Sequence, residues 1–119
     1  KIKKVKKEVN MLFLGFGGRQ IEVDERGYLV DPFAWERKMA EVMAANDGLT
    51  LTEAHWEIIN FLRNYYEKYR ISPKIKIMVK EVGKALGWEK GNTRYLYNLF
   101  PDGPAETSCR YAGIPNPTT

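Results

Sequence analysis

The most constraining feature of the sequence is a long amphipathic stretch in its middle, residues 53–69. Its apolar side chains recur every three or four residues, the period of one face of an α-helix. They are Trp56, Ile59, Leu62, Tyr66 and Tyr69. Thr52 stands directly before the stretch as an N-cap. The pattern predicts a long helix with one buried face, around which the remaining elements are placed.

Shorter helical patterns lie on both sides of this stretch. Asp31-Pro32 predicts a helix start, because Asp caps helices well and Pro is favoured at the first helical position. Gly87 and Gly113 mark helix ends. The expected ranges are residues 31–45, 73–86, 93–100 and 104–112.

The residues before these helices have the pattern of short strands. Residues 12–16 are an apolar run that ends at Gly17-Gly18, and Ile21 and Val23 then alternate with polar residues. A further short strand is expected over residues 28–30. The sequence therefore predicts a two- or three-stranded meander followed by helices.

Composition limits the class of protein. With 44% hydrophobic and 13% aromatic residues, 119 residues suffice for one domain with a modest core. Much of the net charge of +4 comes from residues 1–7, KIKKVKK, so we expect residues 1–10 to be a basic leader or an added segment. The apolar runs are too short to span a membrane. A single cysteine and no signal-like segment predict a cytoplasmic protein.

The residue best suited to chemistry is that single cysteine, Cys109. Arg110 follows it, and an adjacent cation favours the nucleophilic thiolate. The alternative is that Cys109 is a small buried hydrophobe, as many free cysteines are. The chain has only one histidine, His55, too few ligands for a metal site, so we expect no metal or other cofactor and no self-contained hydrolase.

The residues after Cys109 form what we call the arm, residues 113–119. Its prolines prevent regular structure, so it is expected to be extended and mobile. Gly113 would act as its hinge, and Pro115 and Pro117 would limit its disorder. A reactive thiol beside a mobile arm suits a protein that reaches into a partner.

A second interpretation is a helix-turn-helix DNA-binding protein. Residues 79–100, VKEVGKALGWEKGNTRYLYNLF, contain two helical patterns joined by a short turn. The side chains available to the major groove would then be Thr93, Arg94 and Asn98. Those available to the phosphates would be Lys80, Lys84 and Lys90. The signal is weak, because helix–glycine–helix corners also occur in purely structural bundles.

Three segments resemble the DsrC/TusE family of small sulfur-relay proteins. They are LTEAHWEIINFLRNYYEKYRISP (51–73), EKGNTRYLYNLFPDGPAE (89–106) and CRYAGIPNPT (109–118). The resemblance implies an α+β fold that is mostly α, with a small N-terminal β-meander on a bundle of about five helices and a flexible C-terminal arm. It also implies a sulfur carrier rather than a self-contained enzyme, with sulfur held as a persulfide or trisulfide.

The resemblance places Cys109 at the upstream cysteine of DsrC proteins, which act with dissimilatory sulfite reductase. TusE-type members often lack this cysteine and deliver sulfur for tRNA 2-thiouridine synthesis. The family's main carrier cysteine would follow Thr119 directly, so we expect the natural chain to continue with a cysteine. The implied partners are sulfite reductase subunits, DsrEFH- or TusBCD-type sulfurtransferases, and a membrane-complex or tRNA-thiolase acceptor. Residues expected to dock them are Lys74, Lys76, Lys80, Lys84 and Arg110.

Overall fold

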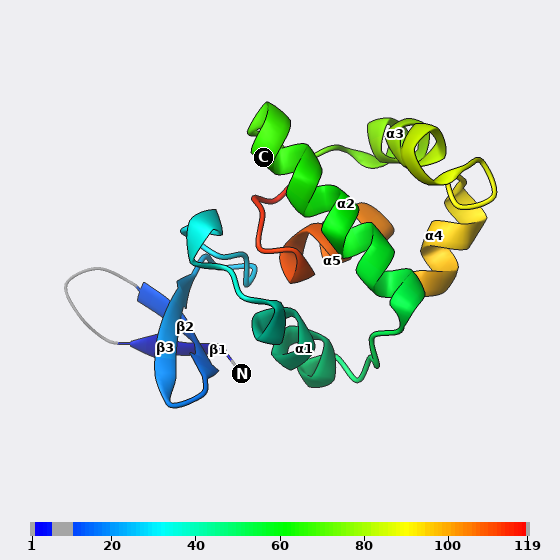
Figure 1. Ribbon diagram of the computed structural model, residues 1–119. Helices are drawn as coiled ribbons and strands as arrows, with labels where there is room; N and C mark the ends of the chain where they lie inside the picture. The colour runs from blue at the N-terminus through cyan, green and yellow to red at the C-terminus, as the bar shows by residue number, and fades with distance from the viewer. Residues whose placement is uncertain (1, 6–10, 119) are drawn as a thin grey trace.

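The computed structural model describes residues 2–5 and 11–118, which form a small antiparallel sheet and a group of helices (Figure 1). The α-helices are α1 (Arg37–Asn46), α2 (Glu53–Tyr69), α3 (Ile75–Leu86), α4 (Thr93–Leu99) and α5 (Pro104–Tyr111), and a short 3-10 helix, η1 (Pro32–Ala34), precedes α1. The predicted α+β, mostly α class is confirmed. Among the described residues, no helix is long and apolar enough to cross a membrane.

The sheet has the strand order β1–β2–β3, with antiparallel pairing throughout. Strands β2 (Met11–Phe16) and β3 (Arg19–Val23) pair from Leu12 opposite Val23 to Phe16 opposite Arg19, and they agree with the predicted hairpin. Strand β1 (Ile2–Val5) was not predicted, because these residues were assigned to a leader; it pairs with β2. The strand expected over residues 28–30 is reduced to a single bridge between Leu29 and Val23.

The helix predicted over residues 31–45 is broken in two. Asp31 accepts a hydrogen bond from the backbone N–H of Phe33 and caps η1, as its sequence position predicts. Trp35 then adopts an extended backbone, with φ −63° and ψ 139°, before α1 begins. This break lets the indole of Trp35 reach α5, where its Nε1 donates to the backbone carbonyl of Tyr111 at 2.8 Å.

Helix α2 has the predicted range. At its start the backbone N–H of Thr52 donates to Nδ1 of His55 at 3.0 Å, and the Thr52 side chain completes a capping box. His55 lies buried with Nε2 2.7 Å from the carbonyl oxygen of Leu99 and its ring edge-on to Phe100. The acceptor role of Nδ1 makes Nε2 the donor to Leu99. His55 is therefore a packing residue that ties α2 to α4.

Helix α3 begins two residues later than predicted, since Lys74 is its N-cap and Pro73 precedes it. Helix α3 and the segment before α4 approach each other closely, because Gly83 and Gly91 lie in contact. A Cβ on Gly91 would lie 2.3 Å from the Cα of Gly83, and Trp88 folds over the other side of Gly83. Helix α4 has the predicted start, with Asn92 accepting from the N–H of Tyr95. Helix α5 ends at Tyr111, one residue earlier than expected.

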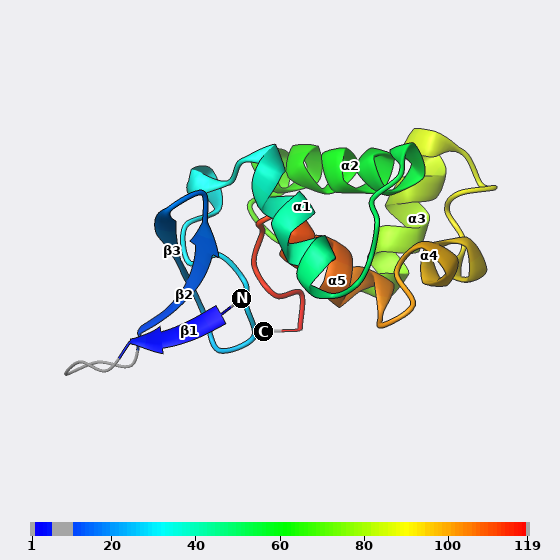
Figure 2. The same cartoon turned by 90° about the horizontal axis from the view of Figure 1, so that it is seen from below.

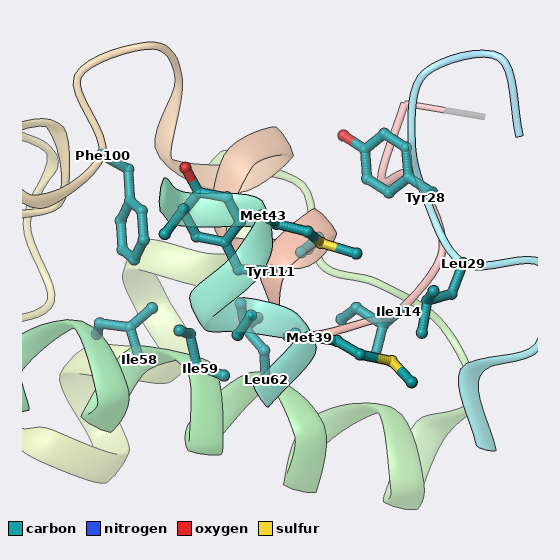
Figure 3. Close-up of a cluster of buried hydrophobic side chains, with 14 of the residues drawn as sticks. Tyr28, Leu29, Met39, Met43, Ile58, Ile59, Leu62, Phe100, Tyr111 and Ile114 are labelled. Carbon is teal, nitrogen blue, oxygen red and sulfur yellow. The ribbon is translucent and has the colours of Figure 1, made fainter. Parts of the chain in front are cut away.

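Helix α5 is the centre of the helical part, and α1, α2, α3 and α4 all contact it (Figures 1 and 2). The sheet extends to one side of this group in both views. One continuous core joins the two parts, and residues from the sheet side, the helices and the arm point into it (Figure 3). Its labelled members include Leu29, Met39, Leu62, Tyr111 and Ile114.

Candidate functional site

Cys109 lies in the last full turn of α5, and its side chain is 0% exposed. Burial raises the pKa of the Cys109 thiol well above its usual range, and the nearby Glu106 raises it further. A hydrogen bond with the Ser72 side chain acts in the opposite direction. In this arrangement Cys109 is a neutral thiol that no reagent or partner can reach.

The expected thiolate-favouring role of Arg110 does not appear in this arrangement. Its guanidinium forms an ion pair with Asp47 at the end of α1, with Nη2 2.5 Å from Oδ2. The hydroxyl of Tyr111 donates to the same carboxylate oxygen at 2.7 Å. Asp47 therefore holds the C-terminal end of α5 against α1, and Arg110 is engaged within the protein.

The chain leaving α5 is held by side chains from distant elements. Trp35 donates to the carbonyl of Tyr111, and Nη1 of Arg63 donates to the carbonyl of Ala112 at 3.1 Å and to that of Pro32 at 2.9 Å. The Arg63 guanidinium also lies 4.6 Å from the centroid of the Trp35 ring. These contacts fix the backbone just before the arm.

The described part of the arm, residues 113–118, is packed against the body. Gly113 has φ +70° and lies against Trp35, which explains why a glycine stands at the predicted hinge. The Ile114 side chain is 0% exposed and points into the core near Met39 and Leu29 (Figure 3). The Ser72 hydroxyl donates to the carbonyl of Pro115 at 2.6 Å, and Pro117 is buried. The mobility of the arm remains a prediction, and the structure presents its docked form.

The lysines expected to dock partners lie on α3 and at its start, and all of them are exposed; they are Lys74, Lys76, Lys80 and Lys84. Lys84 makes one ion pair, 3.6 Å from Glu81, within the same helix. They are separated from Cys109 by the buried face of α3. The structure therefore places these lysines on a free surface but does not bring them together with the thiol.

The residues of the DNA-binding interpretation are also on the surface. Thr93, Arg94 and Asn98 are exposed on α4. Lys90, expected to contact phosphates, instead forms an ion pair with Glu57 of α2 at 2.6 Å. Within the described ranges 2–5 and 11–118, no group of three or more His, Cys, Asp or Glu residues could hold a metal ion.

Sequence reasoning missed the side chains that hold the arm and α5. Trp35 and Arg63 were placed within predicted helices, and Ser72 and Asp47 were assigned no functional role. For Trp35 alone the residue type was a signal, because large aromatic side chains are highly buried on average. The other three act on residues more than 40 positions away, as the contacts from Arg63 to Ala112 and from Ser72 to Pro115 illustrate.

Comparisons with known proteins agree with this geometry. The family described as "DsrC like protein" matches residues 15–119. The chain is 48% identical to "Sulfurtransferase TusE" of Pectobacterium atrosepticum over 104 residues, 87% of this chain and 95% of that protein.

Two solved structures are similar as well. The chain is 54% identical to Allochromatium vinosum DsrC, with a TM-score of 0.83, covering 90% of this chain and 96% of that one. It is 38% identical to the oxidized gamma-subunit of the dissimilatory sulfite reductase (DsrC) from Archaeoglobus fulgidus, with a TM-score of 0.76, covering 88% and 96%. The resemblance noted in three sequence segments is confirmed, and the chain belongs to the DsrC/TusE family.

Proposed function

We propose that this protein is a sulfur carrier of the DsrC type in dissimilatory sulfur metabolism and that Cys109 is one of its sulfur-exchanging thiols. The observation that carries the proposal is the placement of the chain's single thiol at the root of a short arm. The arm begins four residues after the thiol, and the backbone N–H of Ile114 donates to the Cys109 carbonyl at 3.1 Å, so release of the arm would change the surroundings of the thiol. A thiol that must be protected between partners and exposed to them needs such an arrangement.

The chemistry requires no cofactor. The Cys109 thiolate attacks the outer sulfur of a partner's cysteine persulfide, the S–S bond of that persulfide breaks, and the partner's cysteine leaves as a thiolate. Cys109 then carries the transferred sulfur as a persulfide. If a carrier cysteine follows Thr119, Cys109 attacks the inner sulfur of a persulfide on that cysteine; a disulfide forms and hydrosulfide leaves.

The proposed partners are proteins that hold or accept such sulfur. Sulfite reductase subunits come first, because the chain is 54% identical to Allochromatium vinosum DsrC and because the family resemblance implies that Cys109 is the upstream cysteine of DsrC proteins. Sulfurtransferases of the DsrEFH or TusBCD type would act as donors, and the exposed lysines of α3 would contact acidic surfaces on them. A reducing cytoplasm suits a carrier whose thiol must remain free.

The runner-up is TusE-type delivery of sulfur for tRNA thiolation. It is favoured by the 48% identity to the TusE protein of Pectobacterium atrosepticum. The two functions differ in the acceptor, since one delivers sulfur to a sulfite reductase system and the other to a tRNA-thiolating enzyme. Purified protein loaded with labelled sulfur and offered to each acceptor would distinguish them.

The central test is sulfur loading followed by intact mass measurement. Incubation with a small-molecule persulfide donor should add one sulfur atom to the chain, and Cys109→Ser should take up none. A second pair of proteins carries one cysteine added after Thr119. There, the loaded protein should lose hydrosulfide and form a disulfide, whereas Cys109→Ser should stop at the persulfide.

Two results would overturn the proposal. The first is a wild-type chain that gains no sulfur under conditions in which a free small-molecule thiol does. The second is disulfide formation that persists in Cys109→Ser with the added cysteine, since this would have to be intermolecular. Ser108→Ala is the matched control, because it changes the neighbouring buried side chain and leaves the thiol in place.

A further inference from the structure

An exposed surface near the start of the arm combines apolar side chains with an arginine. Phe33 of η1 is 68% exposed, and Ile71, two residues after the end of α2, is 60% exposed. The residue before Ile71 is Arg70, whose guanidinium carbon lies 4.9 Å from the centroid of the Phe33 ring. We call Phe33, Arg70 and Ile71 the arm-root patch. Aromatic residues and arginine are enriched in protein–protein interfaces.

Arg70 has a backbone conformation that does not suit an arginine. Its φ of 59° and ψ of 24° are left-handed, and within residues 2–5 and 11–118 it is the single non-glycine residue with a positive φ. It is the C-cap of α2, where this conformation favours glycine, because a Cβ is disfavoured there. Strained residues of this kind cluster at functional sites. The chain therefore keeps an arginine here at a cost in stability, which indicates a role for its guanidinium outside the fold.

The guanidinium of Arg70 has no acid to pair with inside the fold. Among the described residues it takes part in no ion pair and no hydrogen bond, and it lies over the Phe33 ring instead. The carboxylate of Asp31 caps η1 by accepting from the N–H of Phe33 at 3.0 Å. The N–H donors of Arg70 are therefore available to an external carboxylate, which an arginine binds with two parallel hydrogen bonds.

The arm-root patch adjoins the side chains that hold the arm. On one side, Phe33 follows Pro32, whose carbonyl accepts from the same Arg63 nitrogen that binds the last carbonyl before the arm. On the other side, Ile71 precedes Ser72, whose hydroxyl donates to the backbone of the arm. A protein that covers the patch therefore lies over the place where the arm leaves the body.

The length of the arm limits where a protein that receives it can bind. An extended chain advances about 3.3–3.6 Å per residue, so residues 113–118 reach at most about 20 Å from the end of α5. In both views η1, the end of α2 and the arm lie at one end of the helical group, and α4 lies at the other (Figures 1 and 2). The exposed aromatic side chains near α4, Trp88 and Tyr97, are therefore farther from the arm than the arm-root patch is.

We propose that the arm-root patch is the docking surface for the protein that receives the arm, and that this protein presents a carboxylate to Arg70 between apolar side chains. This inference rests on the proposed function, because it names the surface by which the sulfur carrier binds its partner. Docking removes Phe33 and Ile71 from water, and the apolar surroundings strengthen the bond between Arg70 and the carboxylate. The released arm then enters the partner directly.

The test measures the Kd of the full chain for two purified proteins, a dissimilatory sulfite reductase and a TusBCD-type sulfurtransferase complex. Arg70→Gly is the most informative variant, because glycine suits the left-handed C-cap and the guanidinium is lost without backbone strain. Its urea midpoint of unfolding should not fall. Its Kd should rise about tenfold or more, the effect of losing one hydrogen bond to a charged group.

Phe33→Ser tests the apolar part of the patch. It should raise Kd about tenfold, because the ring no longer leaves water when the complex forms. Tyr97→Ser is the matched control, since it removes an exposed aromatic side chain at the opposite end of the helical group. Its Kd should stay within about twofold of the wild-type value.

The proposal is overturned if Arg70→Gly binds both proteins as tightly as the wild type, if Tyr97→Ser weakens binding as much as Phe33→Ser, or if the wild type binds neither protein. It is equally overturned if sedimentation shows a dimer of the chain that Arg70→Gly dissociates, because a second copy would then cover the patch. Sulfur loading from a small-molecule persulfide donor, followed by mass, separates this result from the carrier function. Binding that depends on the patch in a chain that takes up no sulfur would support the docking surface and contradict the carrier function.

Discussion

Gly113→Ala tests whether the arm is a detachable cover over Cys109. Gly113 has φ +70°, and a Cβ there would lie 2.2 Å from Cδ1 and 2.7 Å from Cγ of Trp35. The indole cannot move aside freely, because its Nε1 donates to the carbonyl of Tyr111 and the Arg63 guanidinium lies over its ring. The substitution therefore meets both backbone strain and a collision.

The two costs can be added. A left-handed backbone costs an alanine about 1 kcal/mol more than a glycine, and an extra methyl group in a packed site costs about 1–3 kcal/mol. The sum is about 3 kcal/mol, and it acts on docking of the arm because Gly113 is the arm's first residue. At about 1.4 kcal/mol for each factor of ten, the released form becomes roughly 100-fold more populated.

The assay is the rate of Cys109 alkylation at urea concentrations below the unfolding transition. Gly113→Ala should raise this rate roughly 100-fold with little dependence on urea, since local release of the arm exposes little surface. Gly18→Ala is the control: Gly18 has φ +79° in the turn between β2 and β3, with nothing within 4 Å of its added Cβ. It carries the backbone cost without the collision and should leave the rate within about twofold.

Two results would refute this reasoning. The first is an unchanged alkylation rate in Gly113→Ala, which would mean that docking of the arm does not limit access to Cys109. The second is a rate whose dependence on urea equals that of global unfolding in both wild type and variant. Access would then require the whole domain to unfold, and the arm would be an ordinary part of the core.

Two further predictions concern the body. Burial raises the pKa of Tyr28 from 10.0 to about 12, so its contribution to stability is complete below pH 10 and is lost as the pH rises towards 12. Tyr28→Phe should make this alkaline loss of unfolding free energy smaller in urea titrations, and an unchanged loss would contradict the assignment. His55→Ala should lower the free energy of unfolding by about 2–4 kcal/mol, because it removes a buried ring and leaves the Leu99 carbonyl unpaired. Urea unfolding followed by tryptophan fluorescence would measure it, and a loss below about 1 kcal/mol would contradict the packing role.

Helices whose ends are encoded by neighbouring residues were predicted well. Helix α2 has the predicted limits because Thr52 and His55 cap it locally, and α5 begins at Pro104 as its sequence position indicates. The break within residues 31–45 was not predictable from helical periodicity. It exists because Trp35 reaches the carbonyl of Tyr111, 76 positions away, and such a contact leaves no mark on local spacing.

The same distinction applies to the candidate site. The sequence singled out Cys109 and Gly113, since a lone thiol and a glycine after a helix are visible as residue types. It did not predict that Ile114 would fill the core, because Pro115 and Pro117 within the arm suggested an extended, mobile segment. The burial that raises the pKa of Cys109 depends on how α5 is surrounded by four helices, and adjacency to Arg110 gave the opposite expectation.

The contacts that hold the arm and the residues just before it involve the backbone more than the side chains. Trp35, Arg63 and Ser72 all donate to backbone carbonyls, which every residue type carries. Three positions of the arm depend on residue type: Gly113 through its φ and its contact with Trp35, and Ile114 through its burial. The third is Asn116, whose Oδ1 accepts from the backbone N–H and the hydroxyl of Thr118. The donors on the body would therefore set how often the arm is released. Substitutions of these donors should alter the frequency of release, and substitutions near the arm's tip should alter recognition by the partner.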